Sequence, residues 1–137
     1  MKRDPLDVLF SEFVRKRALK RAGGCERCGA QKFDIQKDDG SSFPAWSQLD
    51  CAHLISRWHK STRWDEDAAI GLCGGCHMWI DHEEEEKIEL LKSKIGEEGF
   101  NLLQARKRIP ARYLDRNAIE IYLRARILEV NNEFGGE

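Results

Sequence analysis

The sequence lacks any apolar run approaching the roughly 20 residues that a membrane-spanning helix needs. It also lacks an apolar signal segment at its start, where residues 1–4 are mostly charged. Internal repeats are absent, and the one low-complexity stretch is the acidic run at 83–86. Hydrophobic residues make up 41% of the 137 residues, which excludes a disordered chain. We therefore expect one soluble domain in the cytoplasm, with no membrane partner.

A large excess of charge of one sign is missing as well, because the formal net charge is only −1. The charges are nevertheless segregated along the chain. Residues 1–21 hold seven Lys or Arg against three acids, residues 101–126 hold seven against two, and residues 65–98 hold three against eleven acids. Two basic ends are typical of a protein that contacts nucleic acid, although solvated helix faces account for such runs equally well.

Helix and strand signals indicate an α+β fold. Asp4 as N-cap, Pro5 in the first turn and Gly23-Gly24 after a basic last turn predict a first helix. The further elements expected are two short strands within 31–52, a loop over 54–66, a strand over 69–72, a helix beginning within 75–80, helices over 83–95 and 97–107, and a long helix from Pro110 to about Asn131.

Disulfides are not expected in a reducing compartment, so the five cysteines must have a different role. Four of them form two Cys-x2-Cys pairs, Cys25 with Cys28 and Cys73 with Cys76. Two intervening residues let one tight turn present both sulfurs to one ion. Because 44 residues separate the pairs, the ion would clamp two distant segments together. The pattern predicts a Zn²⁺ site of four thiolates, which is closed and therefore structural; a redox dithiol or free buried thiols are the alternatives.

The residues around the two pairs fit this interpretation. Gly29 follows the first pair, and Gly74 and Gly75 lie inside the second, where we expect them to supply backbone freedom at the turns. Cys51 is left over, and we interpret it as a small buried hydrophobe.

The second pair runs directly into His77, and His53 lies on a predicted strand upstream of it. A strand ending in His, a loop, a short strand and then Cys-x2-Cys-His on a helix is the order of a ββα-metal nuclease. Over roughly residues 4–105 the chain resembles the zinc-bearing HNH endonucleases, and within them the phage recombination nucleases of the NinG (Rap) family. The segments that carry the narrower resemblance are Asp4-Pro5-Leu6, residues 9–15, residues 52–57 and residues 62–65.

The resemblance implies that His53 is the general base and that His77 binds a catalytic divalent metal, Mg²⁺ or Mn²⁺. The family usually has an Asn five residues before the first cysteine of the second pair, where it orients the loop of the base. This chain has Ala68 there, with Asp67 beside it, so that support is unassigned.

A second departure concerns the metal. The residue before the base is often a metal ligand in the family, whereas here it is Ala52. Asp50, on the same strand face by alternation, is one substitute. Asp81, one helical turn beyond His77, is another, and His82 competes with it.

The chemistry also follows from the residue types. Phosphodiester hydrolysis needs a base to activate water and a cation to stabilise negative charge. A neutral imidazole suits the first task near pH 7, and an imidazole with carboxylates suits Mg²⁺ or Mn²⁺ for the second. In the loop after His53, Arg57, Lys60 and Arg63 are candidate DNA-phosphate contacts. Of the interleaved tryptophans, Trp64 is expected in the core, and Trp58 either packs there or stacks on a base.

We therefore predict one nuclease domain over 1–137, with an N-terminal helix (1–24), a zinc knuckle and ββα-metal core (25–82) and C-terminal helices (83–137). The resemblance implies branched recombination intermediates as the DNA substrate; a nuclease with little structural preference is the alternative. A branched substrate favours a homodimer, for which the last helix is either the interface or part of the monomer core. The rivals to a nuclease are a non-catalytic zinc-finger DNA-binding module and a zinc-stabilised protein-interaction module, which accounts for fewer of these features.

Overall fold

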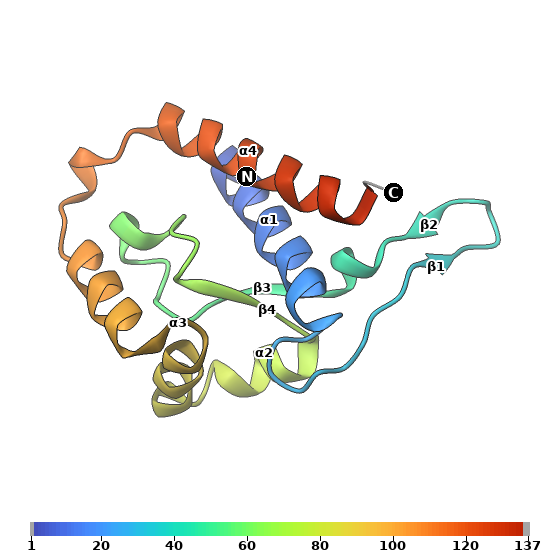
Figure 1. Cartoon of the computed structure of the whole chain (residues 1–137), viewed down its shortest axis with the longest axis horizontal. Helices are drawn as coiled ribbons and strands as arrows, with labels where there is room; N and C mark the ends of the chain where they lie inside the picture. The colour runs from blue at the N-terminus through green and yellow to red at the C-terminus, as the bar shows by residue number, and fades with distance from the viewer. Residues whose placement is uncertain (1, 136–137) are drawn as a thin grey trace.

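The computed structural model describes residues 2–135, and side chains as far as residue 132. Within that range the chain forms four α-helices and two small antiparallel sheets (Figure 1), so the protein is of the α+β class, as the sequence predicts. Across the same residues no helix combines the length and the apolarity needed to cross a membrane.

Helix α1 (Pro5–Ala22) has the two ends that the sequence predicts. The Asp4 carboxylate accepts a hydrogen bond of 2.9 Å from the Leu6 N–H, and Gly23 ends the helix with φ 70°. Both residues satisfy backbone groups that a helix end leaves unpaired. The helix buries the apolar face Leu6, Phe10, Phe13 and Val14.

The central hairpin joins β3 (Asp50–His53) to β4 (Ala69–Leu72). The strands are antiparallel, with Asp50 opposite Leu72 and His53 opposite Ala69. The prediction of a strand over 69–72 is confirmed, and every residue of β4 is buried. Asp50 at one end of β3 and His53 at the other therefore lie in the same small sheet.

Where two strands are expected within 31–52, three form. A second hairpin pairs β1 (Ile35–Gln36) with β2 (Ser42–Phe43), and β3 is the third strand. The turn between β1 and β2 is closed by the Lys37 N–H, which donates to the Ser41 carbonyl. This hairpin extends away from the rest of the molecule (Figure 1).

Helix α2 (Gly74–Ile80) begins directly after β4, and α3 (Glu84–Lys107) follows it. The two helices expected over 83–95 and 97–107 are the two arms of α3, because Gly96 (φ 78°) breaks the helical backbone between them. The start predicted for the last helix is wrong. Pro110 precedes only a 3₁₀ turn, and α4 (Arg116–Gly135) begins after Asp115, whose carboxylate caps the Ala118 N–H.

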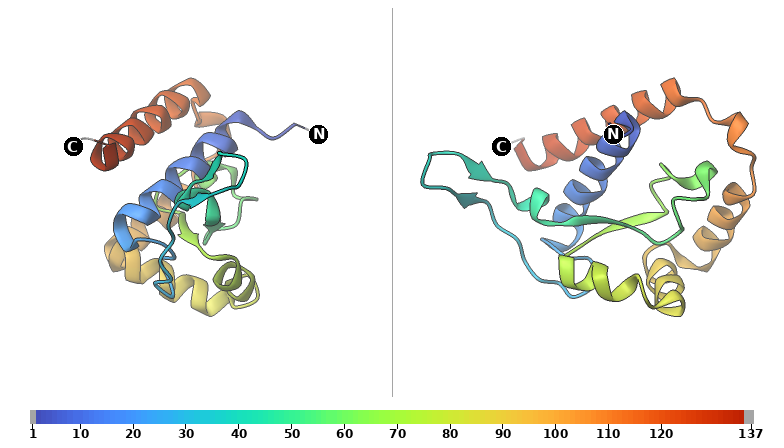
Figure 2. Two further views of the ribbon diagram at one scale, coloured as in Figure 1. Left: turned by 90° about the vertical axis from the view of Figure 1, so that its right-hand side faces the viewer. Right: turned by 180° about the vertical axis from the view of Figure 1, so that it is seen from behind.

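The apolar side chains form two buried clusters. One lies between the β3–β4 hairpin and helices α2 and α3, and the other lies between α1 and α4. Figure 2 shows the arrangement of these helices and strands from two further sides. Among the side chains of α4 that the structure describes, the buried ones are Leu123, Ile127 and Val130. The last helix thus completes the core of the monomer, and the homodimer stays a prediction.

Candidate functional site

The four paired cysteines form one cluster. Their sulfur atoms all lie within 4.8 Å of one another, and those of Cys28 and Cys73 are 3.8 Å apart. Four sulfurs around a tetrahedral Zn²⁺ at about 2.3 Å are expected about 3.8 Å from each other. The first pair follows α1 and the second spans the start of α2. A metal ion such as zinc would therefore join two segments distant in sequence, as the spacing predicts.

The electrostatics of the cluster also call for a cation. Burial opposes ionisation of Cys25, but backbone N–H groups of Cys28, Cys73 and Arg27 outweigh it and lower the pKa of this thiol to about 6. For Cys76, burial and the neighbouring sulfurs raise the pKa despite the Arg27 guanidinium 3.4 Å away. Four thiols this close cannot all ionise by themselves, and a divalent ion removes that conflict. The donor set therefore fits zinc.

The prediction that glycines supply backbone freedom at the two turns is confirmed at Gly29 and wrong at Gly74 and Gly75. Gly29 has φ 77° and its N–H donates to the Cys25 carbonyl, so the first turn needs it. Gly74 and Gly75 lie in the first turn of α2 without a positive φ, and the expectation of special backbone freedom there is wrong. The sequence interpretation also missed Glu26, whose buried carboxylate accepts the Gly71 N–H at 2.9 Å and anchors the first turn to β4.

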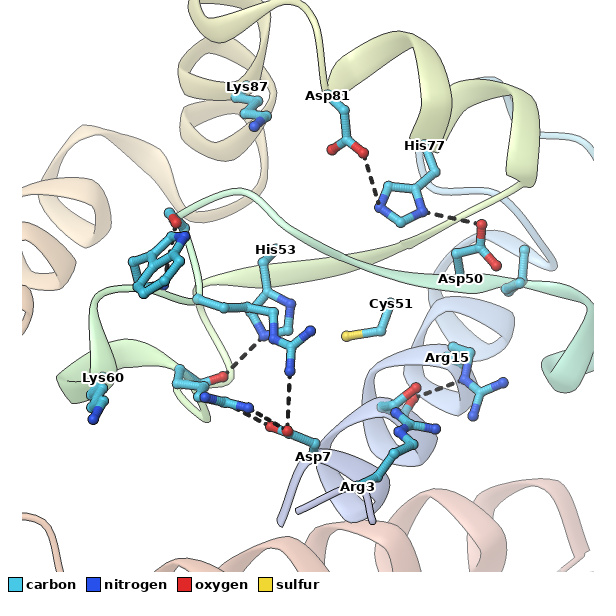
Figure 3. A pocket seen from close by; sticks show the side chains of 16 residues that line it. Arg3, Asp7, Arg15, Asp50, Cys51, His53, Lys60, His77, Asp81 and Lys87 are labelled. Carbon is cyan, nitrogen blue, oxygen red and sulfur yellow. Dashed lines mark hydrogen bonds and ion pairs between the residues drawn. The ribbon is translucent and has the colours of Figure 1, made fainter. Parts of the chain in front are cut away.

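A cleft of about 920 Å³ runs along β3. Both predicted catalytic histidines line it, together with acidic and basic side chains from α1, β3, the following loop and α2 (Figure 3). The sequence-predicted site residues found in its lining are Asp50, His53, Arg57, Lys60, Arg63, His77 and Asp81. His82 is not among the lining residues.

His53 is held at one ring nitrogen. Its Nε2 lies 3.0 Å from the Arg63 backbone carbonyl. A carbonyl only accepts hydrogen bonds, so Nε2 carries the proton, and in the neutral ring Nδ1 keeps its lone pair. Burial lowers the pKa of His53, against the raising effects of that hydrogen bond and of Asp7. The ring is therefore neutral at pH 7. Its centroid lies 5.4 Å from the centroid of the Phe10 ring.

His77 is flanked by a carboxylate at each ring nitrogen. Nδ1 lies 3.1 Å from Asp50 Oδ2, and Nε2 lies 3.7 Å from Asp81 Oδ2 (Figure 3). The two acids thus lie on opposite sides of one imidazole. Among the described residues, the four cysteines are the one group of three or more His, Cys, Asp or Glu whose ligand atoms all lie within 4.8 Å of one another. Asp50 and Asp81 therefore do not share one ion with a single nitrogen of His77 in this arrangement.

The side chains predicted to contact DNA differ in whether they already bind another side chain of the protein. Lys60 is exposed at the rim of the cleft. Arg63 and Arg57 both donate to Asp7 of α1, Arg63 through two nitrogens. Nothing in the sequence predicts this pairing of Asp7, because a partner 56 residues away leaves no local signal.

The remaining predicted residues differ in their burial and in their partners. Trp64 packs against the α1–α4 core cluster, as predicted, while Trp58 is 91% exposed. Cys51 lines the cleft, and burial raises its pKa to about 12, so it is a neutral thiol. Ala68 is fully buried, and Asp67 receives a hydrogen bond from Arg106 of α3. Neither Ala68 nor Asp67 contacts the loop of His53 through a polar side-chain group.

Comparison of the chain with protein families, with curated proteins and with solved structures gives no match.

Proposed function

We propose that the protein is a metal-dependent DNA endonuclease of the HNH type, with β3, β4 and α2 as a ββα-metal core beside a structural zinc knuckle. One observation carries the proposal. His53 and His77 line the same cleft, the first with an unprotonated nitrogen and the second between two carboxylates. This is the pairing of a base with a cation-binding group that phosphodiester hydrolysis requires.

In this proposal His53 is the general base. Its Nε2–H bond to the Arg63 carbonyl leaves Nδ1 to accept a proton from the attacking water. The lowered pKa keeps the ring in the basic form at neutral pH, at the cost of a weaker base. The carbonyl stabilises the protonated ring after the transfer, since the imidazolium still donates from Nε2.

A divalent cation, Mg²⁺ or Mn²⁺, would supply Lewis-acid stabilisation of the negative charge on the phosphate and the leaving oxygen. His77 Nε2 and Asp81 suit it, because two ligands of one ion at about 2.1 Å each are separated by 3–4 Å. Asp50 on Nδ1 suits the carboxylate that fixes the ring of a metal-binding histidine. The three residues thus divide into two ligands and one orienting acid.

The division of roles predicts unequal effects. Asp81→Asn should raise the Mg²⁺ or Mn²⁺ concentration for half-maximal cleavage by on the order of 100-fold, because it replaces a charged ligand. Asp50→Asn should raise it less, since the amide oxygen still accepts from Nδ1. Metal titrations of cleavage measure this concentration for both variants. His82→Ala is the control and should leave it at the wild-type value. A larger effect at Asp50 would reverse the assignment.

DNA binding is assigned to the cations at the rim of the cleft. Lys60 is exposed there, so Lys60→Ala should weaken binding to all sequences alike and reduce the slope of log K against log salt by about 0.9. Binding isotherms at several salt concentrations test this. Lys92→Ala, on α3 and paired with Glu97, is the matched control and should leave the slope unchanged. A sequence-selective loss would argue against phosphate contact.

The decisive experiment for the function is cleavage of linear, supercoiled and four-way-junction DNA with Mg²⁺, with Mn²⁺ and with EDTA. We expect cleavage with a divalent ion and none with EDTA. Preferential cutting of the junction would favour the branched substrates of the NinG (Rap) resemblance. No cleavage of any substrate with either metal would favour the non-catalytic zinc-finger DNA-binding module.

A further inference from the structure

Asp7 of α1 lies against the loop that follows His53, and its carboxylate accepts four hydrogen bonds from it. Arg63 donates from Nε to Oδ1 (2.9 Å) and from Nη2 to Oδ2 (2.5 Å). The Trp64 indole N–H donates to Oδ1 at 2.8 Å, and Arg57 donates to Oδ2 at 3.1 Å. The Asp7 side chain is only 10% exposed. Its charge-assisted hydrogen bonds connect α1 to both ends of this loop.

Arg63 contacts His53 as well as Asp7. The backbone carbonyl of Arg63 accepts a hydrogen bond from the Nε2–H of His53. The Arg63 side chain forms a bidentate ion pair with Asp7. One turn of α1 beyond Asp7, Phe10 packs on the imidazole. Helix α1 thus reaches His53 in two ways, directly through Phe10 and through Arg63 by way of Asp7.

We propose that Asp7 is a positioning residue for His53: it fixes the Arg63 carbonyl that selects the Nε2–H tautomer of the ring. The inference rests on the proposed role of His53 as the base. It fills the support left unassigned at Ala68, whose methyl group is buried and forms no hydrogen bond, while the neighbouring Asp67 is bound to Arg106 of α3.

The charge of Asp7 matters as well as its shape. Burial opposes its ionisation, but the hydrogen bonds of Arg63 and Trp64 and the charges of Arg63 and Arg57 hold the pKa of Asp7 below its usual value. The carboxylate is therefore ionised at neutral pH. It neutralises two arginines at the rim of the cleft, so its removal should free positive charge toward DNA while loosening the carbonyl.

This gives Asp7→Asn a signature that simple destabilisation does not have. We expect kcat to fall on the order of 10-fold to 100-fold, as for a misplaced catalytic group. We expect KM for DNA to stay the same or fall, because Arg57 and Arg63 gain freedom to meet phosphates. Long-range ¹H–¹⁵N NMR of the folded protein should show His53 as the Nε2–H tautomer in wild type and as a mixture of tautomers in the variant.

Glu66→Gln is the matched control. Glu66 ties the same connection to α4 through Tyr122 and Arg126, so the variant loses a comparable carboxylate without touching Arg63. It should keep the wild-type tautomer and kcat. If Asp7→Asn fails to fold, Arg63→Lys tests the same link, because lysine keeps the charge but loses the two-point grip on Asp7.

The outcomes separate this inference from the proposed function. A folded Asp7→Asn protein with the wild-type His53 tautomer overturns the positioning role, whatever its rate of cleavage. If Arg63→Lys is the variant that folds, an unchanged tautomer has the same meaning. A wild-type protein that cuts no DNA sinks the proposed function, and the tautomer measurement still decides whether Asp7 controls His53.

Discussion

His53→Ala should lower the rate of DNA cleavage by on the order of 10²–10⁴-fold or more, while zinc content, folding and DNA affinity stay close to wild type. The reason is that a general base acts in the transition state and contributes little to ground-state binding. The ring also fills space beside Phe10, so His53→Gln is a second variant that keeps more of that volume. Single-turnover cleavage of a labelled duplex gives the rates, and isotherms with Ca²⁺ in place of Mg²⁺ give the affinities.

The pH profile adds a second readout for the same residue. Burial is the largest influence on His53 and lowers its pKa; Arg57 and Arg63 lower it further, and Asp7 and the carbonyl hydrogen bond raise it. Because the neutral ring is the active form, cleavage should decline as pH falls through this pKa. The midpoint of the acid limb of kcat/KM should therefore lie below 6.5, the usual value for imidazole. His53→Ala should lose that limb.

Two comparisons make the result specific to a base. His59→Ala removes an exposed histidine from the same loop and should cut like wild type. His77→Ala should also lose cleavage, but excess Mn²⁺ should restore part of it, because that substitution weakens ion binding and leaves the base in place. Equal behaviour of the His53 and His77 variants under excess metal would contradict the separate roles assigned to them.

The sequence predicts best those features whose signals are local. The ends of α1 are set by Asp4 and Gly23, and β4 is an apolar run between polar turns, so both are located correctly. The cysteine cluster is also correctly predicted, although its pairs lie far apart, because each Cys-x2-Cys pair is a complete local unit. The start of α4 is misplaced because Pro110 and Asp115 are both good starting signals and only packing chooses between them.

The features that the sequence does not reveal depend on distant partners. Arg63 is predicted to contact DNA from its charge and its place in the loop. Its pairing with Asp7 becomes visible only once α1 lies against that loop. Likewise Asp50 and Asp81 are equal candidates in the sequence. They become distinguishable because β3 and α2 place them at opposite nitrogens of His77. In each case the sequence shows which type of side chain is present, and only the fold shows which partner it has.

Removal of the metal from the cysteine cluster should unfold the protein. Binding of structural zinc is worth about 10–16 kcal/mol at pH 7 in small zinc domains, whereas a whole domain is stable by about 5–15 kcal/mol. The first quantity is as large as the whole stability of a typical domain, so its loss should leave no stable fold. The cluster also joins the turn after α1 to the start of α2, and Cys25 and Cys76 are themselves part of the buried core.

The measurement is thermal unfolding followed by circular dichroism, with zinc determined by elemental analysis. Wild type should contain about one zinc per chain and unfold cooperatively, and a strong chelator should abolish the transition. Cys73→Ser should do the same without chelator. Cys51→Ser is the matched control, since it makes the same chemical change outside the cluster and should keep its zinc. A cooperative transition in protein free of zinc would show that the four cysteines are not what holds these segments together.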